Sequence, residues 1–200
     1  MTEAYVNDGR SRCWWAGDPG STHPDPRMLA YHDEEWGVPV HDDQELFERL
    51  ALESFQAGLS WQTILNKREA FRAAFRGFDP ATVATFDDDD RTRLMADAGI
   101  VRNRAKIDAT IGNARVLLAL AAEFGSFDAY LQSKAPGPPA TLPRTAVAGS
   151  IPATTVASDA LSVDLKRLGL RFVGSTIVYS FMQSVGLVDD HLPGCFRYRG

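Results

Sequence analysis

The sequence predicts an all-α fold, and three features indicate it. Apolar residues recur at helical spacing along most of the 200 residues, and residues that favour helix starts and stops separate these segments. Runs of alternating apolar and polar residues are too short to predict a half-buried strand. With 44% hydrophobic residues the chain can bury an ordinary core. We expect residues 12–200 to form a single domain behind a disordered extension at 1–11.

The first strong helical pattern starts at Asp42 or Asp43, either of which can cap it, and continues to Ala57. Its apolar stripe contains Leu46, Phe47 and Leu50. Glu53 falls inside this stripe, so we expect its carboxylate to be either paired or functional, because an unpaired buried charge is costly. The side predicted to face solvent carries Glu45, Glu48 and Arg49.

Two more helices follow directly. Gly58 ends the first helix, and Ser60 is placed to cap the next one, over residues 61–75. Asp79 as N-cap with Pro80 in the first helical position predicts another start. The four acids at 87–90 suit the beginning of a further helix, because negative charges are stabilised at the positive end of the helix dipole.

A helix ending at Gly99 and another beginning near Asn103 predict a helix-hairpin-helix unit at about residues 91–120. The net charge of −5 argues against a nucleic-acid partner, but this stretch is locally basic. Amide groups at the hairpin would suit a phosphate, helped by Arg102, Arg104 and Lys106. Short Gly-containing turns between helices are common, so the hairpin alone does not distinguish an anion site from an ordinary turn.

The C-terminal third begins with residues 133–155, which have no clear period and predict an extended loop or crossover. A helix follows with Ser158 as cap and Gly169 as stop, and a buried helical stripe comes after it in FVGSTIVYSFMQSVG. Apolar runs stay well below the roughly 18–20 residues that span a bilayer. We therefore expect no membrane contact and a cytoplasmic location.

Each of the two cysteines has a histidine near it in the sequence, and the four residues suggest a metal site. Cys13 and His32 lie near one end, and His191 and Cys195 near the other. Together they can form a tetrahedral Cys₂His₂ site, in which two thiolates would neutralise Zn²⁺ and the ion would fasten the two ends together. His-x₃-Cys spacing is weak on its own, so the residues alone leave a ligand pair and a coincidence about equally favoured.

All four tryptophans occur in the same third of the chain as Glu53. The aromatic set is Trp14, Trp15, Tyr31, Trp36 and Trp61. Core packing is the common role of such residues. A pocket of aromatic rings with one carboxylate would instead suit a flat, positively charged ring, through stacking and cation–π attraction.

Several long motifs resemble the 3-methyladenine DNA glycosylase I (Tag) family, a branch of the helix-hairpin-helix glycosylases. They run in the family's order from Arg12 to Cys195: RCWW, AYHDEEWGVP, LFERLALESFQAGLSW, DAGIVRNRAKIDATIGNA, PATTVASDALS, FVGSTIVYSFMQSVGLVDDH and the closing GC. The resemblance implies a helix-hairpin-helix glycosylase fold whose terminal segments are joined by a structural zinc ion. It also implies monofunctional hydrolysis that releases 3-methyladenine from alkylated double-stranded DNA after base flipping, by a monomer.

The same resemblance assigns roles by motif position. Glu53 would hydrogen-bond the flipped base, Tyr31, Trp36 and Trp61 would form its pocket, and Trp15 would lie against that pocket. The zinc ligands would be Cys13, His32, His191 and Cys195. Gly99 with Arg102 and Arg104 would hold the DNA backbone, and Gly58 and Leu59 would approach the gap left by the base. The family lacks the aspartate that activates water in many related glycosylases, so the activator of the water stays open.

The chain departs from the family pattern in a longer link between Cys13 and His32, and in Trp14 and Ser54, where smaller residues are usual. Two other functions remain to be compared with hydrolysis of the glycosidic bond. A zinc hydrolase would need an open coordination position, which four protein ligands would not leave. A non-catalytic DNA-binding module would have no need for a carboxylate on the apolar face beside the tryptophans.

Overall fold

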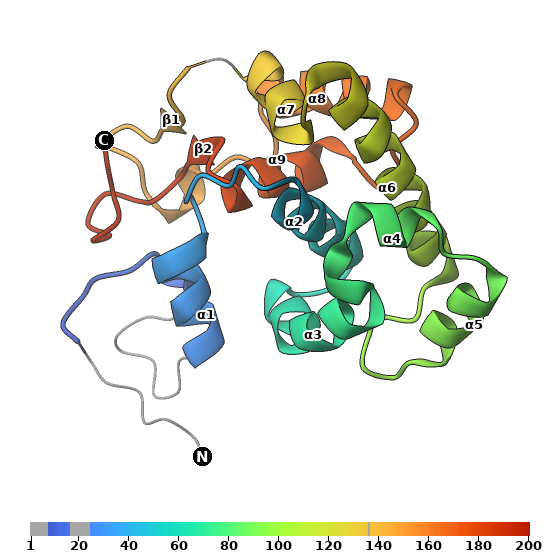
Figure 1. The fold of residues 1–200 in the computed structure, drawn as a ribbon. Coiled ribbons are helices and arrows are strands. Elements are labelled where there is room, and N and C mark those ends of the chain that lie inside the picture. The colour runs from blue at the N-terminus through green and yellow to red at the C-terminus, as the bar shows by residue number, and fades with distance from the viewer. Residues whose placement is uncertain (1–7, 17–24, 136) are drawn as a thin grey trace. The chain divides into compact units, whose positions relative to one another are not determined.

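The computed structural model describes residues 8–16, 25–135 and 137–200, and these are mostly helical, as predicted (Figure 1). The helices are α1 (Pro26–Ala30), α2 (Asp43–Gln56), α3 (Trp61–Ala74), α4 (Pro80–Ala84), α5 (Asp88–Ala96), α6 (Arg104–Phe124), α7 (Phe127–Lys134), α8 (Val156–Arg167) and α9 (Ser175–Ser184). Two strands of two residues each, β1 (Ala140–Thr141) and β2 (Val188–Asp189), were not predicted. Residues 1–7 of the extension predicted to be disordered lie outside the described residues.

Side-chain oxygens cap the helices close to where the sequence places them. Asp42 Oδ1 accepts a hydrogen bond from the Glu45 amide at 2.9 Å, and Ser60 Oγ accepts one from the Thr63 amide at 3.2 Å. The cap predicted for α8 was wrong. Thr155 is the N-cap, and Ser158 is the third helical residue of a reciprocal capping box, because its hydroxyl accepts from the Thr155 amide at 2.8 Å.

The chain packs into two compact units. The smaller unit combines three chain segments, Met1–Pro39, Pro138–Ala153 and Met182–Gly200. The larger unit combines Val40–Gly137 and Thr154–Phe181. That residues 12–200 behave as one domain stays a prediction.

The larger unit contains α2 to α8 and a core of phenylalanine rings. Helix α4 packs on α6, and α2 contacts α3, α6 and α7, which lie around it in Figure 1. The rings of Phe75 and Phe78 stack at 5.3 Å between centroids, and Phe55 contacts Phe71 at 4.7 Å. Such close-packed rings fix the positions of α2 and α3, which carry the predicted site residues Glu53 and Trp61.

Helix α2 buries two charged side chains that were predicted to face solvent, Glu48 and Arg49. Glu48 accepts hydrogen bonds from Arg72 Nε on α3 at 2.9 and 3.0 Å, and Arg49 donates to Glu45 at 2.8 Å. Pairing makes the burial tolerable. For Glu48 the prediction was wrong because helical periodicity within one segment does not show that a partner comes from another helix. For Arg49 the partner lies one turn away on the same helix.

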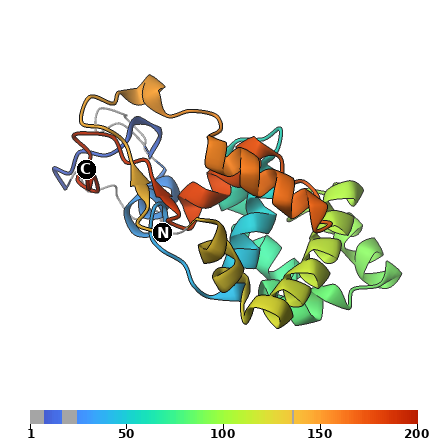
Figure 2. The same ribbon diagram turned by 90° about the horizontal axis from the view of Figure 1, so that it is seen from above.

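The smaller unit holds α1, the two strands and the C-terminal residues. β1 and β2 pair in parallel, with Ala140 opposite Val188 and Thr141 opposite Asp189 (Figure 2). The segment 133–155 is otherwise irregular, as predicted, apart from the end of α7 and a 3-10 turn at Ala148–Ser150. Among the described residues, the helices are too short or too polar to cross a bilayer.

Candidate functional site

Three of the four predicted metal ligands come together in the smaller unit. One ligand atom each from Cys13, His32 and Cys195 lies within 4.8 Å of the others, and all three residues are buried. Cys195 Sγ is 3.4 Å from His32 Nε2. Backbone amides donate to both sulfur atoms at 3.4 Å, from Leu192 to Cys13 and from Arg197 to Cys195. Amide donors of this kind stabilise thiolates, the form in which cysteine binds metals.

His191, the fourth predicted ligand, packs edge-on against His32 with ring centroids 5.0 Å apart. Its Nε2 is buried and has no hydrogen-bond partner within the described part of the chain. A buried ring nitrogen without a partner is costly in a folded protein, and a metal ion would satisfy it. The two thiols and two imidazoles, with this orphaned nitrogen on one of them, therefore fit a tetrahedral Cys₂His₂ site for an ion such as zinc.

Two carboxylates orient the imidazole rings, and the sequence reasoning missed both. His32 Nδ1 is 2.8 Å from Asp33 Oδ1, and His191 Nδ1 is 2.6 Å from Asp189 Oδ1. Metal-binding histidines typically bond a carboxylate through the nitrogen that does not face the ion, which fixes the tautomer. The available signal was an acid within two residues of each histidine.

The local backbone brings these rings together. Tyr31–Glu35 forms a π-helical turn, in which the Trp36 amide donates to the Tyr31 carbonyl at 2.8 Å. Such widened turns occur frequently at functional sites. Gly37 follows with φ +72°, and a Cβ there would lie 3.0 Å from His191 Cε1. A side chain at this position would be strained by the backbone conformation and would crowd His191.

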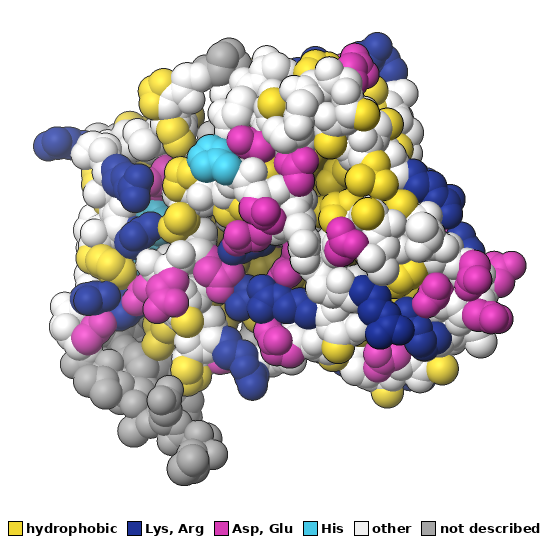
Figure 3. Space-filling model, in the orientation of Figure 1, with side chains coloured by type: hydrophobic (Ala, Val, Ile, Leu, Met, Phe, Trp, Pro, Cys, Tyr) yellow, Lys and Arg dark blue, Asp and Glu magenta, His cyan; other side chains and the backbone are white. Residues whose placement is uncertain are grey.

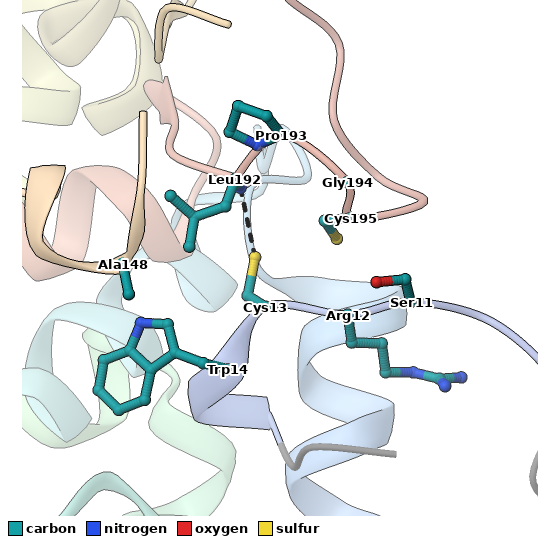
Figure 4. Close-up of a pocket in the computed structure, with 9 residues that line it drawn as sticks. All are labelled: Ser11, Arg12, Cys13, Trp14, Ala148, Leu192, Pro193, Gly194 and Cys195. Atoms are coloured by element: carbon teal, nitrogen blue, oxygen red, sulfur yellow. Dashed lines mark hydrogen bonds between the residues drawn. The ribbon is translucent and has the colours of Figure 1, made fainter. Parts of the chain in front are cut away.

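A cavity of about 300 Å³ opens beside the cysteines, and Figure 4 shows the side chains that line it. Cys13 and Cys195 contribute their sulfur atoms, and Trp14, which is 63% exposed, forms part of the rim. Arg12 also lines the cavity and donates to Asp33 through Nε at 2.8 Å and Nη2 at 2.6 Å. The Asp33 carboxylate that orients His32 is therefore itself held in place.

Three of the predicted base-binding aromatic residues cluster in the smaller unit around the histidines. Trp15 contacts Trp36 at 4.9 Å and Tyr31 at 6.2 Å between ring centroids. Trp36 contacts His191 at 4.7 Å, edge to face. If these rings form a wall of the base pocket, that wall packs directly against the candidate metal ligand His191. The fourth, Trp61, is the first residue of α3 in the larger unit.

Glu53 is the most unusual charged group of the larger unit. The side chain is 2% exposed, and Oε2 has no hydrogen-bond partner among the residues described. Burial raises the pKa of Glu53 to about 8, against a smaller opposite effect of Arg49. The prediction of a carboxylate on the apolar face is confirmed. Perturbed and unpaired acids of this kind are concentrated at functional sites.

The turn after α2 presents the next two predicted residues. Gly58 has φ +84°, and nothing lies within 4 Å of a Cβ built on it. Leu59 is 42% exposed. An exposed apolar side chain at such a tip is suited to insertion into a base stack.

The hairpin between α5 and α6 differs from the prediction in detail. The Gly99 amide is occupied, because it donates to Asp97 Oδ1 at 2.7 Å. Within the described residues, no hydrogen bond is found for the amides of residues 100–102, and the Arg102 side chain is exposed. Arg104 bonds Asp108 at 3.1 Å. On the face shown in Figure 3, basic and acidic side chains are interspersed rather than gathered in one basic band.

Lys106 was expected to favour a phosphate, and this was wrong. It is 6% exposed, and its Nζ donates to the carbonyl oxygens of Phe55 at 2.9 Å and Ala57 at 2.7 Å. The ammonium group thus satisfies carbonyls at the end of α2, which would otherwise lack partners. Spacing along α6 could not reveal an acceptor on another helix.

Comparisons with known proteins identify the family of this chain. The pattern of the methyladenine glycosylase family matches residues 21–198. The chain is 49% identical over 189 residues to DNA-3-methyladenine glycosylase 1 of Escherichia coli (strain K12), covering 94% of this chain and 97% of the relative. It is 43% identical to DNA-3-methyladenine glycosylase of Haemophilus influenzae, covering 92% and 96%.

Solved structures give the same result. A crystal structure of 3-methyladenine DNA glycosylase I (TAG) matches with a TM-score of 0.87 and 47% identity, over 94% of this chain and 100% of the other. A variant of such an enzyme in complex with 3-methyladenine matches with a TM-score of 0.84 and 40% identity, over 88% and 94%. This chain therefore belongs to the methyladenine glycosylase family.

Proposed function

We propose that this protein releases 3-methyladenine from alkylated double-stranded DNA by hydrolysing the N-glycosidic bond, the first step of base-excision repair. The similarity to glycosylases of that name over nearly the whole chain carries the proposal. The buried carboxyl of Glu53 supports it, because its Oε2 lacks a hydrogen-bond partner among the described residues and an acid in an apolar setting is suited to binding a cation.

The chemistry of the substrate fits the residues assigned to it. Methylation at N3 gives the base in DNA a positive charge, so it is already a good leaving group and needs little acid catalysis. Glu53 would accept hydrogen bonds from the base, and Tyr31, Trp36 and Trp61 would stack on it, with Trp15 behind them. Since burial raises the pKa of Glu53 to about 8, a cationic base would favour the carboxylate and be preferred over neutral adenine.

We propose a structural role for zinc, bound by Cys13, His32, His191 and Cys195. The orphaned Nε2 of His191 and the carboxylates on both Nδ1 atoms support this assignment. We expect about one zinc per chain by elemental analysis, and a lower melting temperature for Cys195→Ser. A metal-free protein of equal stability would contradict the assignment.

DNA contacts are proposed at two loops of the larger unit, the helix-hairpin-helix turn and the turn after α2. Arg102 and the amides of residues 100–102 suit a phosphate better than the Gly99 amide, which Asp97 occupies. Gly58 and Leu59 would fill the gap left by the flipped base, which offsets the few kcal/mol that extrusion costs. Action as a monomer and a cytoplasmic location stay predictions.

The direct test is to incubate the protein with DNA treated with a methylating agent and to separate the released bases by chromatography. We expect free 3-methyladenine from the wild type and much less from Glu53→Gln. Gln56→Ala, a neutral change on the same helix, serves as the matched control and should retain activity. Tight binding of the methylated DNA without any free base would favour a non-catalytic DNA-binding module instead.

A further inference from the structure

Two lysines connect the turn after α2 with the hairpin before α6. One lies on the helix after the hairpin and bonds carbonyls at the end of α2, and the other lies on the helix after the turn and bonds carbonyls of the hairpin. Lys106, on α6 after the hairpin, donates to Phe55 O at 2.9 Å and Ala57 O at 2.7 Å. Lys67, on α3 after the turn, donates to Ala98 O at 3.2 Å and Gly99 O at 3.0 Å. The two loops therefore hold each other reciprocally.

The burial of Lys106 shows that this connection is costly to build. An ammonium group that is removed from water is stable only when its donors are satisfied, and burial alone lowers the pKa of Lys106. A helix end is more commonly satisfied by a glycine turn or by a basic residue in its own last turn. Helix α2 has no basic residue in its last turn, and Lys106 from α6 takes that place.

Close backbone packing also fixes the position of the hairpin relative to α3. A Cβ on Gly99 would lie 2.9 Å from the Cβ of Ala70 on α3, so the hairpin approaches α3 as closely as glycine allows. Asp97 fixes the hairpin internally through the Gly99 amide. Asn103, at the end of the hairpin, accepts from the Lys106 amide at 3.2 Å. A displacement of the hairpin would therefore be transmitted to the turn that carries Leu59.

We propose that Lys67 and Lys106 are positioning residues that couple backbone gripping at the hairpin to insertion of Leu59 at the turn. This inference rests on the proposed glycosylase function. Neither lysine touches the base; both keep the tip of the turn at a fixed position relative to the phosphates held by the hairpin. Their contribution applies to double-stranded DNA, where a base must leave a stack, and is absent for an unpaired base.

The test compares rates on methylated double-stranded and single-stranded DNA for Lys106→Met and Lys67→Met. Methionine retains most of the length of the side chain and removes its hydrogen bonds. We expect Lys106→Met to lower kcat/KM on duplex at least about 10-fold more than on single strands, with a smaller loss of the same kind for Lys67→Met. Binding of free 3-methyladenine, followed by tryptophan fluorescence, should be unchanged. Lys166→Met on the exposed side of α8 is the matched control.

Each outcome distinguishes the inference from the function on which it rests. A wild type that releases no 3-methyladenine from either DNA refutes the proposed function. Equal losses on duplex and single strands, or unchanged rates on both, overturn the coupling. If Lys106→Met fails to fold, the test rests on Lys67→Met, because Lys67 is only half-buried. That variant must then show the duplex-specific loss of kcat/KM for the inference to stand.

Discussion

Replacing Glu53 by glutamine should stabilise the protein at neutral pH and change its stability much less near pH 5. The pKa of this carboxyl is raised from 4.5 to about 8 by burial. Below pH 4.5 the group is protonated in both the folded and the unfolded chain, so its ionisation does not lower the free energy of unfolding. As the pH rises toward 8 only the unfolded chain ionises, so the wild type loses stability over this range.

The magnitude follows from the size of the shift. Each pH unit between the two pKa values costs about 1.4 kcal/mol, so the wild type should lose roughly 2–3 kcal/mol relative to Glu53→Gln between pH 5 and pH 7. Urea unfolding of both proteins at several pH values measures this difference, and groups that titrate in both proteins cancel. Gln56→Ala carries no titrating change and should differ from the wild type by a constant amount. A constant difference for Glu53→Gln as well would refute the reasoning from burial.

Two further predictions concern the candidate metal centre. Asp33→Asn removes the carboxylate at His32 Nδ1, so we expect metal affinity to fall about 10–100-fold in competition with a chelator; unchanged affinity would mean that Asp33 does not orient the ring. Gly37→Ala combines φ +72° with a Cβ 3.0 Å from His191, and should lower the melting temperature more than Gly125→Ala, where φ is +93° but the space is open. Equal effects of the two glycine changes would show that crowding at His191 is unimportant.

Local signals in the sequence predicted the starts of several helices, although α1 and α7 were not predicted. Asp42, Ser60 and Asp79 cap the helices for which they were chosen, because a capping bond joins residues two or three positions apart. Ser158 was misplaced because Thr155, three residues earlier, can cap equally well, and the two form a reciprocal pair. The strands β1 and β2 are too short to leave a period in the sequence.

Charged side chains were harder to place than apolar ones. Glu53 was predicted to be buried because every neighbour on its stripe is apolar. Glu48, Arg49 and Lys106 were misjudged because their partners depend on how α2, α3 and α6 pack or on which rotamer is chosen. Choosing the candidate metal ligands needed the resemblance as well, since no spacing rule relates residues that are separated by most of the chain.

The three-segment construction of the smaller unit has a consequence for protein synthesis. His32 emerges from the ribosome long before His191, and at about 5–20 residues per second the roughly 160 residues between them take about 10–30 s to make. During this interval Cys13 and His32 exist without their later partners, at a stage when a nascent thiol is open to oxidants and to competing metals. If the proposed zinc ion binds, the order of its candidate ligands along the chain would make metal capture one of the last events in the maturation of this unit.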